Sequence, residues 1–281
     1  MKQRSKSEVH SRLAGTKAVA RALRIARTFT DARPEWTLAG LSRELGLSKP
    51  TALRLLAALE REGLVVRSDA SGAYRLGPAA IELGARAQRS NSTASAARPE
   101  MEDLTRATGE TSSIEILSED ETVILDEVQG GHLIGTSPSV GTRWPAHATS
   151  TGKVLLAAAL EQDASLIQKM TRRAGGRLRR LTSCTIGTSA RLALELARVS
   201  KQGYATAMGE LEEGYVAIGA PVRNHDGEVV AAVSLGGPST RFTESRLPRL
   251  IKLVREAAAR VSQRLGYVVR SAGGASRVAG S

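Results

Sequence analysis

The first third of the chain carries short amphipathic segments separated by turn residues. Val19, Leu23 and Ala26 recur at helical spacing with arginines between them, which predicts a helix over residues 15–29. The segment DARPEW at residues 31–36 then favours a turn, because Asp31 and Pro34 are residue types that interrupt helices.

Two further helices are predicted, joined by a tight turn. Thr37 is a good N-cap for the segment TLAGLSREL, and Gly46 ends it because glycine takes a left-handed conformation at little cost. Ser48 caps a third helix over residues 49–62, in which Pro50 is tolerated because the first turn needs no intrahelical donor. The side chains expected to face inward from this helix are Ala52, Leu55, Leu56 and Leu59.

A hairpin is predicted directly after the third helix. LVVRS and AYRL have the pattern of short strands, and DASG between them has the composition of a turn. Two short helices joined by a glycine-containing turn and followed by a hairpin are typical of a winged helix-turn-helix. We place this DNA-binding domain at residues 15–77, after a flexible basic start at residues 1–14.

The rest of the chain predicts an α+β domain at residues 97–267, reached through a linker helix within residues 78–96. We expect that helix to end near Arg89, a soft break in RSNSTASAARP, and a new helix from about Ala97 to Thr108. An antiparallel sheet with helices on its faces is expected beyond, and a disordered tail at residues 268–281. The strand-like segments are SSIEIL, TVILDEV, HLIGTS, YATAM, YVAIGAPV and EVVAAVSL, and the helical ones are KVLLAAAL, RLALELARVSKQG and RLPRLIKLVREAAARVSQRLG.

The charge is concentrated at the start of the chain. Residues 1–92 hold 17 Lys+Arg against 8 Asp+Glu, a net of +9 out of +12 for all 281 residues. A basic domain joined to a near-neutral one suits a nucleic-acid reader coupled to a second function, although solubility alone would also explain the charge. Aromatic residues make up only 3%, which argues against a surface that stacks RNA bases.

The N-terminal end of the third helix carries the residues expected to read the major groove. These are Ser48, Lys49, Thr51 and Arg54, and Arg67 and Arg75 of the hairpin are expected at backbone phosphates. Arginine can bind guanine through two hydrogen bonds, whereas Ser48 and free helix N–H groups suit a phosphate. The alternative for each basic residue is a solvated surface charge, and for Ser48 a cap alone.

The chain resembles the isocitrate lyase regulator (IclR) family of bacterial transcription factors. The resemblance covers about residues 15–267 and rests on LGLSKPTALRLLAALEREGLV, YRLGPAAIELG, VGTRWPAHATSTGKVLLA, GYATAMGELEEGYVAIGAPVRN and VVAAVSLGGP. It implies a winged-helix reader, a GAF-like effector domain that binds a small organic acid or related metabolite, homodimers or tetramers, and control of a catabolic operon. Repression is favoured over activation.

The second domain contains the expected effector site. Ser150, Thr151 and Gly152 open a helix whose N–H groups attract a carboxylate, and Gly152 allows close approach of a ligand. Ordinary capping would explain Ser150 or Thr151 equally well, and Trp144 lines the pocket or packs beneath it. Four further pocket positions are inferred from the resemblance, and they are Ala207, Ala217, Ser234 and Gly236. At three of them, Ala207, Ala217 and Gly236, this chain is small and non-polar where the resemblance implies a polar residue. We therefore expect a roomier pocket with fewer hydrogen bonds, suited to a bulkier effector such as an aromatic acid.

Two rival classes of function have little support in the sequence. A metabolite-processing enzyme would need a catalytic constellation, yet STGK lacks the flanking residues of a phosphate loop and the four histidines have no metal-ligand spacing. Cys184 has no evident base partner, and Glu210, Glu212 and Glu213 are expected in a solvated loop or dimer contact. A pure ligand sensor would not need the basic reader. We therefore expect a cytoplasmic, non-enzymatic regulator without cofactor or metal whose partners are an operator with paired half-sites, an effector and further copies of itself.

Overall fold

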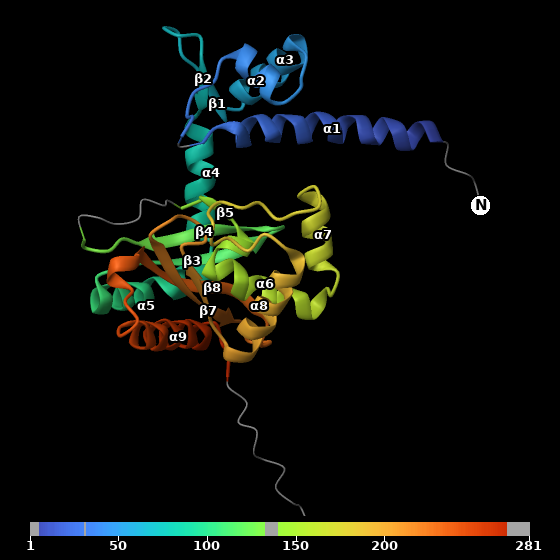
Figure 1. The fold of residues 1–281 in the computed structure, drawn as a ribbon. Coiled ribbons are helices and arrows are strands. Elements are labelled where there is room, and N and C mark those ends of the chain that lie inside the picture. The colour runs from blue at the N-terminus through green and yellow to red at the C-terminus, as the bar shows by residue number, and fades with distance from the viewer. Residues whose placement is uncertain (1–5, 31, 133–139, 269–281) are drawn as a thin grey trace, which may run out of the picture. The chain divides into compact units, whose positions relative to one another are not determined.

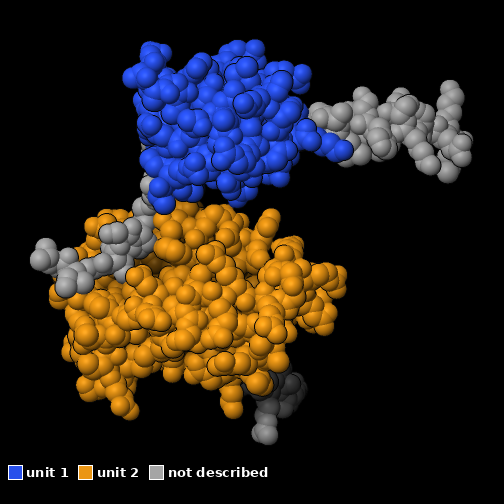
Figure 2. Space-filling model, turned by 45° about the horizontal axis from the view of Figure 1, so that its top comes forward, with its two compact units in different colours: residues 1–90 blue, residues 91–281 orange. Residues whose placement is uncertain are grey.

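The computed structural model describes residues 6–30, 32–132 and 140–268, and the chain divides into two compact units at residues 1–90 and 91–281 (Figure 2). Three expectations therefore lie partly outside the described residues: the start at 1–5, the strand HLIGTS at 133–137 and the tail at 269–281. No helix in the described part is long and apolar enough to cross a membrane.

The first unit is the expected winged helix-turn-helix (Figure 1). Its elements are α1 (Lys6–Thr28), α2 (Leu38–Glu44), α3 (Lys49–Arg61), β1 (Val65–Arg67), β2 (Tyr74–Leu76) and α4 (Pro78–Arg89). The Thr37 hydroxyl accepts a hydrogen bond from the Gly40 amide, which confirms the predicted N-cap of α2. Gly46 takes a φ of 62°, the left-handed conformation expected of the residue that ends this helix.

Helix α1 differs from the prediction in its length, and its apolar residues divide between the core and the surface. It begins at Lys6 rather than at residue 15, so residues 6–14 of the expected flexible start are helical. Val19 and Leu23 are 60% and 54% exposed, and the core instead receives Ile25 and Phe29. The apolar spacing correctly predicted a helix, but α2 and α3 pack against its neighbouring face.

The helices and the wing of the first unit pack on one another through a single hydrophobic core. Leu56, Leu59 and Ala52 of α3 are buried as predicted, whereas Leu55 is half-buried. Trp36 lies beside the wing, where its backbone exchanges two hydrogen bonds with Tyr74 at 2.9 and 2.8 Å. The indole nitrogen of Trp36 also donates to the Thr28 carbonyl oxygen at 3.2 Å, so one residue joins α1 to the wing.

The connection between the units contains two helices with a break, as expected, but the second starts early. Helix α5 (Ser92–Thr108) begins at Ser92 rather than near Ala97, because the Asn91 side chain accepts from the Ala94 amide and caps it. Pro99 lies inside α5, where it lacks the backbone N–H that would donate to the carbonyl oxygen of Ser95.

The second unit is an antiparallel sheet with helices on both faces, which confirms the predicted α+β architecture (Figure 1). Within the described residues the sheet has six strands in the order β5-β4-β3-β8-β7-β6. The strands are β3 (Thr111–Ser118), β4 (Glu121–Val128), β5 (Arg143–Pro145), β6 (Ala205–Met208), β7 (Tyr215–Arg223) and β8 (Val229–Pro238), and the helical elements are η1 (Ala146–Ala148), α6 (Ser150–Gln162), α7 (Leu166–Arg173), α8 (Ser189–Gln202), η2 (Ser239–Arg241) and α9 (Leu247–Arg264).

The two faces of this sheet differ in chemistry. One face is aliphatic and packs against α5 and α9, through residues such as Ile114, Ile218, Val233 and Leu235. The alternate positions of the same strands are small or polar and face α6. Helices α7 and α8 complete a second core with α6. The polar face of the sheet therefore lies inside the unit, between the strands and α6, where it can line a cavity.

The short edge strand β5 and helix α7 were not among the predicted elements. β5 is only Arg143–Pro145 and pairs with the start of β4, and α7 packs through Ile167 and Met170. Elements of this length bury too few residues to show a period in the sequence.

Candidate functional site

The N-terminal end of α3 presents most of the predicted DNA-reading residues to solvent. Ser48, Lys49 and Arg54 are exposed, and Thr51 is half-buried. The Ser48 and Thr51 hydroxyls are 2.8 Å apart, and the Ser48 side chain makes no capping hydrogen bond to the helix backbone. The first-turn N–H groups of α3 are therefore not satisfied by Ser48, which leaves them able to bind a phosphate oxygen.

The two wing arginines point to opposite faces of the hairpin. Arg67 pairs with Tyr74 and Arg75 pairs with Val66 in the register of β1 and β2. The Arg67 guanidinium lies 5.8 Å from the centre of the Tyr74 ring, on the face that carries the buried Val65. Both arginines are exposed, but a single strand of DNA on one face of the wing would be contacted by only one of them.

The second site is a cavity between the sheet and the start of α6. The cavity volume that the centre of a water molecule can occupy is about 40 Å³. On the same measure a single bound water needs roughly 10–15 Å³, so the cavity is small. The cavity wall brings together seven of the eight predicted effector residues, which are Trp144, Ser150, Thr151, Ala207, Ala217, Ser234 and Gly236.

Strand register explains why residues so distant in sequence meet here. Ala207 pairs with Ala217, Ala217 with Gly236, and Gly236 with Thr111, so these side chains form one row across four strands. A second row, one step along, joins Gly219, Ser234, Ser113 and Glu127.

Gly152 is not part of the cavity wall, and its expected role was wrong. A Cβ atom at this position would come 2.1 Å from the Ala146 carbonyl oxygen, so the glycine lets α6 pack on η1 rather than admit a ligand. The cap of α6 is Thr149, whose hydroxyl accepts from the Gly152 amide at 3.0 Å. Ser150 and Thr151 are accordingly not its N-cap.

The expected extra room beside Gly236 is occupied. A Cβ atom at Gly236 would lie 1.9 Å from the hydroxyl oxygen of Tyr215, whose ring fills the space that the glycine leaves. The expectation of few hydrogen-bonding groups was also wrong. Two carboxylates and several hydroxyl groups line the cavity, namely Glu115 and Glu127 with Thr111, Ser113, Thr149, Ser150, Thr151, Tyr215 and Ser234.

Glu115 and Glu127 are the functional candidates that sequence reasoning missed. Glu115 alternates with Ser113 and Thr111 along β3, so its face could have been inferred from the strand period. The face of Glu127 could not have been inferred in this way. Ile124 and Glu127 are three residues apart on β4, and strict alternation would place their side chains on opposite faces of the sheet. A bulge in the β3–β4 pairing, between the Ile114–Asp126 and Glu115–Ile124 pairs, brings both to the cavity.

The cavity shifts the pKa of both carboxylates upward. Burial raises the pKa of Glu115 despite hydrogen bonds from Thr151, at 2.7 Å, and Ser113, at 2.9 Å. Burial also raises the pKa of Glu127 to about 7, and the negative charge of Glu115 adds to the shift. Burial likewise raises the pKa of the Tyr215 hydroxyl, so this group stays protonated near neutral pH.

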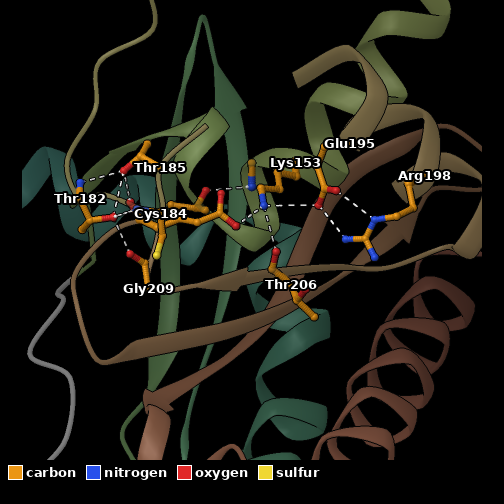
Figure 3. Close-up of polar contacts among 11 residues, drawn as sticks. Lys153, Thr182, Cys184, Thr185, Glu195, Arg198, Thr206 and Gly209 are labelled. Carbon is orange, nitrogen blue, oxygen red and sulfur yellow. Dashed lines mark hydrogen bonds and ion pairs between the residues drawn. The ribbon is translucent and has the colours of Figure 1, made fainter. Parts of the chain in front are cut away.

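A buried lysine holds the wall of the cavity in place (Figure 3). The Lys153 ammonium on α6 is 1% exposed and donates to Glu210 at 2.5 Å, to the Thr206 carbonyl oxygen at 3.0 Å and to Glu195 at 3.4 Å. Arg198 also binds Glu195, at 2.9 Å to the Oε1 atom that Lys153 contacts and at 3.0 Å to Oε2. The ammonium is therefore committed to these carboxylates and is not one of the cavity-lining groups.

The same network fastens the loop at residues 209–214, which carries Leu211 of the cavity wall. Thr182 and Thr185 donate to the carbonyl oxygens of Gly209 and Glu210, each at 2.6 Å (Figure 3). Burial raises the pKa of Glu210, opposed by Lys153. The expectation of a solvated Glu210 was thus wrong, because this carboxylate completes a buried ion pair, whereas Glu212 and Glu213 are exposed.

The residues that suggested an enzyme are accounted for by structure. His147 is buried, its Nε2 donates to the Arg179 carbonyl oxygen at 2.8 Å, and burial lowers its pKa, which keeps the ring neutral. Cys184 is exposed on the loop between Thr182 and Thr185 (Figure 3). The STGK segment does not act as a phosphate-binding loop, because its Lys153 is paired with the carboxylates of Glu195 and Glu210.

The first unit is a winged helix-turn-helix with an exposed basic helix end, and the second is an α+β unit with a small polar cavity. This combination is typical of ligand-responsive DNA-binding regulators. Comparison with known proteins agrees. Residues 18–69 match the IclR helix-turn-helix domain, and residues 86–263 match the C-terminal domain of bacterial IclR transcriptional regulators. The chain belongs to the IclR family, whose members are transcription regulators and not enzymes.

Individual relatives align over nearly their full length. The chain is 31% identical to the HTH-type transcriptional regulator XynR of Escherichia coli strain K12 over 250 residues, 89% of this chain and 97% of that one. It is 28% identical to the transcriptional repressor IclR of the same strain over 251 residues, 89% and 90% of the two chains. The crystal structure of an IclR homolog from Microbacterium hydrocarbonoxydans in complex with 4-hydroxybenzoate matches with a TM-score of 0.72 at 27% identity, covering 88% and 98%.

Proposed function

We propose that the protein represses transcription by binding an operator with paired half-sites, and that a small molecule in the cavity of the second unit controls this binding. The observation that carries the proposal is the N-terminal end of α3, which presents Lys49 and Arg54 beside unsatisfied helix N–H groups. Repression is supported by the relationship to the E. coli repressor IclR. Because operator DNA is part of the bacterial chromosome, we expect the protein to act in the cytoplasm.

The individual DNA contacts follow from side-chain chemistry. Arg54 is placed to bind guanine through two hydrogen bonds, which contributes about 1–3 kcal/mol of discrimination. Lys49, Ser48 and Thr51 are proposed at the phosphate next to the start of α3, and Arg67 and Arg75 at phosphates on either face of the wing. Leu53 is 47% exposed on the same helix, and an apolar side chain there can contact a thymine methyl group.

Binding to two half-sites requires at least a homodimer, and α1 has an exposed apolar surface on which a second copy could pack. Val19 and Leu23 are one helical turn apart and largely exposed, so they form an apolar strip on a basic helix. Ile81 of α4 is also 75% exposed. We propose that a second copy covers these side chains and sets the distance between the two readers, about 34–36 Å for half-sites one helical turn apart.

The cavity is proposed as the effector site because register brings its predicted residues together beside α6. Binding there would reset the spacing of the two readers through α4, the helix that leaves the wing. An organic or aromatic acid, as the family resemblance implies and as 4-hydroxybenzoate in the related structure illustrates, would be held by hydroxyl groups and by the α6 N-terminus. Its carboxylate would also lie near Glu115 and Glu127, which repel it when ionised.

A salt-dependent gel shift on the promoter upstream of the gene tests the proposal. We expect a specific complex, and Arg54→Ala should weaken it by about 1–3 kcal/mol while changing binding to random DNA less. Arg61→Ala is the matched control, because this exposed arginine lies at the opposite end of α3. Absence of any shift at low salt would contradict the regulator, and equal losses on specific and random DNA would reduce Arg54 to a phosphate contact.

A further inference from the structure

The second unit carries much of its positive charge in one stretch of the chain. Residues 164–194 contain seven Lys+Arg and no Asp or Glu, whereas the rest of residues 91–281 contains 16 Lys+Arg against 20 Asp+Glu. The near-neutral total of this unit therefore combines a strongly basic segment with an acidic remainder. Charge separated in this way gives a local positive potential, which attracts polyanions.

Five arginines concentrate this charge at the end of α7 and in the segment that follows it. All five side chains are exposed, and they are Arg172, Arg173, Arg177, Arg179 and Arg180. Within the described part of the chain no carboxylate forms an ion pair with any of them, whereas Lys169 is paired with Asp163 at 2.6 Å. Like charges this close together repel one another, so a bound anion would stabilise the cluster.

The helix dipole accounts for only part of the cluster. Arg172 and Arg173 lie in the last turn of α7, where a cation interacts favourably with the helix C-terminus. Arg177, Arg179 and Arg180 lie beyond the helix, in a segment that is neither helix nor strand. Their charge therefore serves no element of the unit itself.

The segment after α7 is fixed to the body of the second unit. The Arg179 backbone carbonyl oxygen accepts a hydrogen bond from the buried His147, and Leu178 is buried in the core that α6 and α8 share. Residues 182–185 then fasten it to the 209–214 loop (Figure 3). An anchored backbone loses less conformational freedom on binding than a flexible tail does, so the arginines are presented ready to bind.

We propose that this basic surface, the side chains of the five arginines, binds the phosphate backbone of double-stranded DNA. The protein then holds DNA with its second unit as well as with its reader. The inference rests on the proposed function, because a reader bound to its half-site keeps DNA at a high effective concentration for the rest of the chain, which favours DNA over other polyanions. Arginine also suits phosphate, because its planar guanidinium donates two parallel hydrogen bonds to the phosphate oxygens.

Phosphate contacts have a signature that separates this surface from the reader. They carry no sequence information, so their loss should weaken binding equally on the operator and on a scrambled duplex of the same length. Arg54→Ala, in contrast, should weaken the operator complex more. Each lost phosphate contact also lowers the slope of log K against log salt by about 0.9, so the salt dependence counts the contacts.

Fluorescence anisotropy of the full chain on labelled promoter DNA, measured at several salt concentrations, tests the proposal. The variant R172Q/R173Q/R177Q removes three positive charges and leaves the anchored Arg179 in place. We expect its salt slope to be less steep by at least about 2. Its affinity at about 0.15 M salt should fall at least about tenfold, on promoter and scrambled duplex alike.

Two matched variants control for net charge and for folding. R249Q/K252Q/R255Q removes the same charge from exposed positions of α9, which packs on the opposite face of the sheet, and should leave the salt slope unchanged. R172K/R173K/R177K keeps the charge and should retain most of the affinity, because a lysine still binds phosphate as a point charge.

Three outcomes would overturn the inference: an unchanged salt slope in the arginine-to-glutamine variant of α7, an equal loss in the α9 variant, or a lysine variant as weak as the glutamine one. Specific promoter binding in any of these cases leaves the proposed function standing on the reader alone. A wild-type chain that binds no promoter DNA at low salt contradicts the proposed function itself, and the inference with it.

Discussion

Replacement of Lys153 by methionine tests whether the buried network stabilises the cavity wall. Methionine keeps most of the side-chain volume but removes the ammonium, so Glu210 loses its ion pair while Glu195 keeps Arg198. Lys153 is 1% exposed and Glu210 is 11% exposed at the side chain, so water screens this pair little. Removing one partner of such a pair costs about 3–5 kcal/mol, and we expect a loss in that range for the second unit.

The assay needs to report on the second unit alone. The chain has two tryptophans, Trp36 in the first unit and Trp144 in the second, so Trp36→Phe leaves a single reporter in the unit that contains Lys153. Urea denaturation followed by Trp144 fluorescence in this background then gives the free energy of unfolding of each variant.

A second variant and a change of pH sharpen the test. Lys153→Met with Glu210→Gln removes both charges and should regain most of the lost stability, because no unpaired carboxylate remains. The deficit of the single variant should also shrink from about pH 7 to about pH 5, because burial raises the pKa of Glu210 and the carboxyl group can take up a proton. A deficit below about 1 kcal/mol, or a double variant no more stable than the single one, would refute the reasoning.

Three further predictions concern single positions. Gly236→Ala should destabilise the second unit by about 1–3 kcal/mol because its methyl group meets the Tyr215 hydroxyl, and Tyr215→Phe should recover part of that loss in urea denaturation; equal stability of all variants would show that the ring moves freely. The pKa of Glu127, about 7 in the folded protein, means that its contribution to stability is full below its ordinary pKa and is lost as the pH rises through about 7. Glu127→Gln should therefore be more stable than the wild type at about pH 8 and not at about pH 4, and parallel stability curves over that range would contradict the shifted pKa. Thr37→Ala removes the acceptor for the Gly40 amide and should lower the stability of the first unit by about 1 kcal/mol in thermal unfolding, whereas Thr37→Ser should not.

The helices of the reader illustrate what local sequence can determine. Thr37 and Gly46 begin and end α2 through their own hydrogen bond and backbone conformation, and these effects operate over three or four residues. The same is true of the main strands of the second unit, whose alternation of large apolar with small or polar positions predicted an antiparallel sheet. The face of α1 that enters the core depends on tertiary packing: Ile25 and Phe29 are buried, whereas Val19 and Leu23 of the same helix are exposed.

The cavity between the sheet and α6 was predicted in part. Ala207, Ala217, Ser234 and Gly236 follow the family resemblance, and strand register confirmed that they line one cavity. Its chemistry was predicted wrongly, because the carboxylates of Glu115 and Glu127 and the ring of Tyr215 come from other places in the chain. The Tyr215 ring fills the space beside Gly236, which no property of the glycine itself reveals.

The sequence by itself determined most of the elements, the basic reader and the membership of the family, because these depend on spacing, caps and long motifs. Only the tertiary structure decided which charges are buried and where they point. The bulge in β4 turns the Glu127 carboxylate into the cavity, and the approach of α8 and the 209–214 loop commits Lys153 to Glu195 and Glu210. Burial and pairing arise between residues far apart in the chain, so the charge on the cavity wall is a property of the folded sheet and not of any segment.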